Sequence, residues 1–137
     1  MTRESRRLAA LLLLIYPTVV FGGVSVLRFL ITREHGYVDN PLRQDLWRAG
    51  HAHAGVFLLL SLVLLRYVDE AALSSPWKAI ARLTTPTAAI LVPAAYFLSV
   101  LSPAATEVNG LIGLAFVGAG VLILGFIVLG IGLWKAA

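Results

Sequence analysis

Two of the chain's three histidines, His51 and His53, lie in the stretch 48–55, Arg-Ala-Gly-His-Ala-His-Ala-Gly. This stretch stands between a charged segment and the apolar run 56–60. A neutral imidazole ligates zinc, copper and haem iron, and it exchanges protons near neutral pH. Ionisable groups at membrane depth are costly, and they usually face a bundle interior or a water-filled cavity. We therefore expect any chemistry of this chain at these two histidines.

A bound metal or haem is one interpretation of the pair. Successive residues of a helix turn by ~100°, so His51 and His53 are ~200° apart and cannot both reach one metal from a regular helix. A tetrahedral site needs three or four ligands. A haem clamped between two histidines is disfavoured because no other apolar stretch contains a histidine. The candidate further ligands are His35, Asp39, Asp45 and Glu107.

Proton transfer is a second interpretation. Arg48 or Arg28 beside a histidine would disfavour the imidazolium and leave a neutral general base for a small amphiphilic substrate.

The third interpretation is structural, with both histidines binding backbone carbonyls and fixing helix packing. The sequence contains no phosphate-binding loop, nucleophile elbow or His-Glu-x-x-His zinc motif, so the three interpretations stay open.

The composition is that of a membrane protein. Of the 137 residues, 59% are hydrophobic and 13% are charged, whereas soluble domains have about 25% charged residues. The net charge is +4, but the basic residues cluster at the ends of apolar runs, which favours a lipid bilayer over nucleic acid as the partner. The absence of cysteine excludes disulfides, thiolate metal sites and cysteine nucleophiles.

Four apolar stretches are long enough to cross a membrane as helices, which takes ~20 residues. They cover about 8–31, 46–68, 79–101 and 110–134. We predict an all-α, antiparallel up-down four-helix bundle in which residues 1–137 form one transmembrane domain. The first stretch is expected to be a retained span rather than a signal peptide, because its apolar run is too long. Asn40-Pro41 and Ser75-Pro76 are typical helix starts.

The distribution of basic residues predicts the orientation. With four spans, the termini and the middle loop share one side, which carries seven of the eleven basic residues. Positive charge favours the cytoplasmic side, so we expect cytoplasmic termini in the inner (plasma) membrane. The two histidines then lie near the outer face, in an outer-facing polar pocket. The other expected members of this pocket are Arg28, Arg48, Tyr37, Asp39, Asp45, Glu107 and Asn109.

The last apolar stretch is rich in glycine, which lets helices pack closely in membranes. Its glycines are Gly113, Gly118, Gly120, Gly125, Gly130 and Gly132. They predict close packing within the bundle, against a second copy or against a partner in a membrane complex. A non-catalytic accessory subunit of a larger membrane complex, such as a respiratory one, is therefore the alternative function.

The motif of residues 48–55, together with the preceding Asp39-Asn40-Pro41 turn, resembles a group of small bacterial four-helix membrane proteins. This resemblance covers most of the chain and implies little about function. In layout the chain also resembles hydroxylaminobenzene mutase, which has a histidine at the start of its second span. That family would imply a cofactor-free rearrangement of an aryl hydroxylamine to an aminophenol. The mutase pattern has an acidic residue after its histidine, where this chain has Ala54. Histidines that open a span also resemble the catalytic subunit of haem–copper oxidases, whose other spans are missing here.

Overall fold

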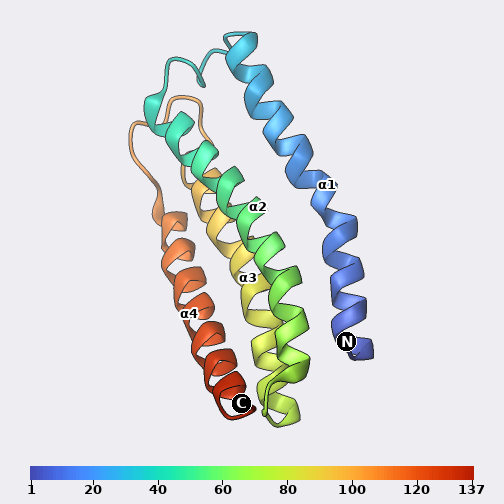
Figure 1. The fold of residues 1–137 in the computed structure, drawn as a ribbon. Helices are drawn as coiled ribbons and strands as arrows, with labels where there is room; N and C mark the ends of the chain where they lie inside the picture. Colours follow the sequence, from blue (N-terminus) through green and yellow to red (C-terminus); the bar gives the residue numbers. More distant parts are fainter.

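The chain is all-helical, as predicted. The computed structural model describes residues 1–137 and contains four α-helices, which lie side by side with both chain ends at the same end of the molecule (Figure 1). The helices are α1 (Arg3–Ile31), α2 (Pro41–Glu70), α3 (Ser75–Ser99) and α4 (Gly113–Trp134), and a 3-10 turn, η1 (Gly110–Ile112), precedes α4.

The predicted start of α2 is confirmed. The Asn40 side chain accepts a hydrogen bond of 3.0 Å from the backbone N–H of Arg43, and Pro41 is the first helical residue of α2. Gly36 has φ +74° in the turn before it, a conformation that glycine adopts at little cost. α3 begins at Ser75, one residue before the predicted start.

Three of the four expected spans are long and apolar enough to cross a membrane: α1, α2 and the helical segment Gly110–Trp134. α3 is less apolar than these three spans, and the burial of its residues within the bundle explains why. Nine of its residues are buried, more than in any other helix, and they include Thr84, Thr85 and Ser99. Its composition therefore suits contact with neighbouring helices rather than with lipid.

The core lies around α3. One cluster of buried side chains joins α2, α3 and α4: Val68, Ala71, Ala81, Val128 and Leu129. A second cluster joins α1 to α2 and α3: Leu12, Leu58, Leu65 and Ala89. α1 is the most peripheral helix, since only Ser5 and Leu12 are buried on it. Its exposed apolar side chains are suited to lipid contact.

The glycines of α4 divide between two faces. A Cβ atom on Gly118, Gly125 or Gly132 would collide with Val92, Thr84 or Leu73, respectively. These three glycines recur every seven residues and allow close approach to α3 and the loop before it. A Cβ atom on Gly113, Gly120 or Gly130 would meet nothing within 4 Å. Close packing within the bundle therefore accounts for half of the helix's glycines.

We predict that Gly125→Ala destabilises the protein, because its methyl group would displace Thr84 between two packed helices. Overpacking of this kind costs about 1–3 kcal/mol. The matched control is Gly120→Ala on the same helix, which should be neutral or slightly stabilising because alanine favours the helix. Thermal unfolding in detergent micelles would compare the two, and equal melting temperatures would contradict the assigned packing.

Candidate functional site

The two histidines contact different helices. A Cβ atom on Gly23 of α1 would lie 2.8 Å from both Cε1 and Nε2 of His51. The His53 ring instead packs edge-on against Tyr96 of α3, with 5.3 Å between ring centroids. The ~200° between them on a helix accounts for this separation.

His51 lines an open groove between α1 and α2. The groove has a volume of ≈ 530 Å³, within the usual range of small-molecule sites. Tyr16 and His51 bear its two titratable side chains, and the remaining lining is apolar or glycine. Several of its side chains are more than half exposed, among them Val20 at 56% and Val56 at 59%. The groove therefore opens sideways, where lipid would surround the protein.

His53 is half-buried where α2 packs on α3. Its Nδ1–H donates a hydrogen bond of 2.7 Å to the carbonyl of Ala49, so a neutral ring carries its lone pair on Nε2. Phe57 packs against it at 5.4 Å between centroids. Next to it, Gly50 is buried and leaves room for Phe97 and Tyr96. These contacts are those of a residue that fixes the packing of α2 on α3.

The structure does not gather the expected residues into one outer pocket. Arg48 forms an exposed ion pair of 2.8 Å with Asp45, and Nδ1 of His35 lies within hydrogen-bond distance of Asp39, at 2.9 Å. Arg28 is exposed near the end of α1. The Asn109 side chain binds backbone groups of Leu98 and Leu111, and Glu107 is exposed. Short-range partners within the loops and α2 therefore engage most of the polar groups that we expected around the histidines.

A buried arginine joins the elements at the end of the bundle opposite the chain termini. Arg43 is 9% exposed, and its guanidinium donates to the carbonyls of Val100 at 3.2 Å, Gly36 at 2.8 Å and Leu101 at 3.1 Å. Its Cζ lies 4.0 Å from the centroid of the Trp47 ring, a favourable cation–π distance. One side chain thus ties the loop before α2 and the loop after α3 to α2.

Tyr37, an expected pocket member, belongs to this arginine's surroundings. It is 1% exposed and packs against Phe29 and Trp47, with centroid distances of 5.6 Å and 5.9 Å. Burial raises the pKa of its phenol, so it stays protonated at neutral pH. Its hydroxyl has no hydrogen-bond partner. Tyr37 therefore contributes to aromatic packing between the loop and the helices.

The metal interpretation gains no support from this arrangement. Nowhere do three or more histidine, cysteine, aspartate or glutamate side chains lie close enough together to hold a metal ion. The two histidines point to different helices, and the side chains of Asp39 and Asp45 are exposed and bind His35 and Arg48 instead. His51 is the imidazole that remains available to a molecule in the α1–α2 groove.

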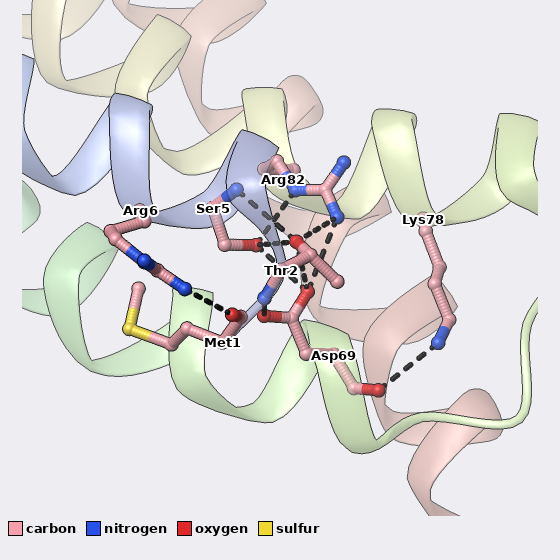
Figure 2. A network of polar contacts seen from close by, with 7 residues as sticks. All are labelled: Met1, Thr2, Ser5, Arg6, Asp69, Lys78 and Arg82. Carbon is pink, nitrogen blue, oxygen red and sulfur yellow. Dashed lines mark hydrogen bonds and ion pairs between the residues drawn. The ribbon is translucent and has the colours of Figure 1, made fainter.

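A polar network joins three helices at the opposite end of the bundle (Figure 2). Asp69 accepts hydrogen bonds from the Thr2 N–H at 2.6 Å, the Ser5 hydroxyl at 2.8 Å and Arg82 at 3.3 Å. Nε of Arg82 also donates to Ser5, at 3.0 Å. Lys78 completes the network with a bond of 3.1 Å to the Asp69 carbonyl.

This Asp69 network fixes the start of α1 on α2 and α3. Asp69 lies beyond the apolar part of α2. Burial raises the pKa of its carboxyl, but hydrogen bonds from Thr2, Ser5 and Arg82 outweigh burial and lower the pKa to about 2. The carboxylate is therefore ionised at neutral pH. Sequence reasoning missed the network; the only hint was an arginine, Arg82, placed several residues inside a predicted helix.

Comparisons with protein-family models, curated proteins and solved structures found no match to this chain.

We predict that Gly23→Ala destabilises the contact between α1 and α2 by about 1–3 kcal/mol, because the new methyl group would collide with the His51 ring. The neighbouring Gly22→Ala is the control, since its Cβ atom would lie 3.8 Å from Nδ1 of His51, an ordinary contact. The loss should disappear when Gly23→Ala is combined with His51→Ala, as a double-mutant cycle of unfolding free energies would show. Additive effects would place His51 elsewhere.

We predict that Asp69→Asn destabilises the protein by about 3–5 kcal/mol, because it leaves the largely buried Arg82 without its counter-charge. The matched change is Glu70→Gln, which breaks the exposed pair with Arg66 and should cost below about 1 kcal/mol. Denaturant or thermal unfolding in micelles would measure both. Similar losses for the two variants would show that the network does not hold α1.

Proposed function

We propose that the chain is a multi-pass inner-membrane protein that binds a small apolar or amphiphilic molecule in the groove between α1 and α2. In this proposal all four helices cross the bilayer alternately up and down. Both termini are cytoplasmic, in keeping with the positive-inside bias. α3 crosses as a helix shielded from lipid by its neighbours. His51 then lies toward the outer leaflet.

The observation that carries the proposal is the place of His51 in an otherwise apolar groove. Val20, Val24, Leu27, Val56 and Leu59 are each more than half exposed there, so a ligand would enter directly from the acyl-chain region. An apolar lining with one or two placed polar groups is the usual composition of a small-molecule site. His51 and Tyr16 would supply those polar groups.

Proton transfer is the chemistry that this site supports best. A single imidazole beside an apolar ligand can donate and accept a proton in one reaction cycle. The rearrangement of an aryl hydroxylamine needs a group that both donates and accepts a proton. The imidazolium would protonate the hydroxyl oxygen as the N–O bond breaks and water leaves. That water would form the new C–O bond on the ring and return one proton to the imidazole, and the hydrogen displaced from the ring carbon would move to the nitrogen. The product is an isomer of the substrate, so atoms and electrons balance without a cofactor. We therefore propose an isomerase of this mutase-like class.

A second candidate is the accessory subunit of a larger membrane complex. It is favoured by the glycines of α4 that do not pack against α3. Gly113, Gly120 and Gly130 leave the backbone of α4 open, which allows a second helix to approach closely. The occupant would be a helix of a second copy or of a membrane-complex partner.

The proposed activity predicts turnover of hydroxylaminobenzene to aminophenol by the purified protein in detergent. His51→Gln should lower kcat by about 10²–10⁴-fold, the usual contribution of a general acid or base. Ala52→Phe should raise KM, because its side chain would fill the groove. Product analysis by liquid chromatography, with an absorption spectrum and elemental analysis of the same sample, would measure these effects.

The control is His53→Gln, which alters the other histidine of the motif while leaving the groove lining intact. A folded protein that loses equal activity in both histidine variants would contradict a specific role for His51. A protein without turnover that co-purifies with a membrane complex, and keeps that partner after His51→Ala, would support the accessory-subunit function. A Soret band or stoichiometric metal would favour a redox site instead.

A further inference from the structure

A second groove lies between the first turns of α1 and the start of α3. Its volume is ≈ 400 Å³. Arg7 and Arg82 supply its cationic groups, and Leu8, Leu11 and Leu83 supply its apolar lining. It belongs to the end of the bundle that holds the Asp69 network, far along α1 from the groove that contains His51.

The lining changes from charged to apolar in the direction that leads into the membrane. On α1, Arg7 is followed one turn later by Leu11, which is 53% exposed. On α3, which starts at the same end, Leu83 directly follows Arg82 and is 54% exposed. One helical turn advances ~5.4 Å. On α1 the guanidinium of Arg7 therefore lies at headgroup level when Leu11 lies at the upper acyl chain, and on α3 Leu83 adds exposed apolar surface next to Arg82.

The two arginines are available to an anion in different ways. Arg82 is positioned by Asp69 and Ser5, and its Nη1 makes no hydrogen bond within the protein (Figure 2). Arg7 is exposed and forms no ion pair. The only carboxylate in the groove is Glu4, close to Arg82. Basic side chains outnumber acidic ones at this end of the bundle: Arg3, Arg6, Arg7, Arg66, Lys78, Arg82 and Lys135 against Glu4, Asp69 and Glu70.

We propose that this groove binds an anionic phospholipid. The phosphate would lie between Arg7 and Nη1 of Arg82, and one acyl chain would run along Leu8, Leu11 and Leu83. Basic pockets between transmembrane helices on the cytoplasmic side recognise anionic headgroups in this way. A zwitterionic lipid would bind more weakly because its ammonium group offsets the phosphate charge. The inference is independent of the chemistry proposed for His51.

The test is lipid titration into the full chain in detergent, followed by native mass spectrometry. Phosphatidylglycerol and phosphatidylcholine with the same acyl chains are the probes. We expect phosphatidylglycerol to bind more tightly, and Arg7→Gln to weaken it about five-fold, the effect of one basic residue near a charged headgroup. Glu4→Gln should strengthen it by removing the competing carboxylate. Arg82 is left intact because it supports the Asp69 network.

The matched control is Arg66→Gln, which removes one positive charge from the same end of the bundle outside the groove. It should leave the affinity for phosphatidylglycerol unchanged. Circular dichroism would verify that Arg7→Gln is folded, as expected for an exposed side chain. Equal binding of the two lipids, or equal losses in Arg7→Gln and Arg66→Gln, would overturn the site.

Discussion

The arrangement of the four helices depends on shielding α3 from lipid. Pro86 and Pro93 each remove a backbone donor from that helix and free a carbonyl four residues earlier. Together with its buried threonines, they make α3 the helix least suited to face lipid, where unsatisfied backbone groups are costly. α2 and α4 cover it from two sides, and small residues make the close approach possible. Gly125 admits Thr84 on one side, and Gly50 admits Tyr96 and Phe97 on the other.

The position of α1 follows from this constraint. With α3 already covered, α1 packs mainly on α2, and its strongest attachments lie near its two ends. The Asp69 network holds its start, and the aromatic cluster of Phe29, Tyr37 and Trp47 holds its end. Between these attachments only one face of α1 is covered, and grooves open beside it. Both proposed binding sites, the groove with His51 and the groove with Arg7, are consequences of this peripheral packing.

The two histidines of the motif therefore have different surroundings despite their closeness in sequence. His53 contacts α3, where a hydrogen bond and two aromatic rings fix it. His51 contacts α1, the helix with the fewest buried residues, and it borders an open groove. The surroundings of His53 suit a packing role, and those of His51 suit contact with a ligand. We therefore propose the packing interpretation for His53 and the proton-transfer interpretation for His51.

The sequence by itself determined the features that depend on neighbours in the chain. Apolar runs gave the helices, Asn40-Pro41 gave the start of α2, and helical periodicity separated His51 from His53. Only the tertiary structure decided which helix each histidine faces, that Arg43 is buried, and that Asp69 joins Ser5 and Arg82. These contacts connect residues as far apart as Arg43 and Val100, 57 positions, or Arg82 and Ser5, 77 positions. Local patterns do not record such partners, because the same arginine at a helix end can extend into solvent or turn into the bundle, and only the packing of the other helices decides between them.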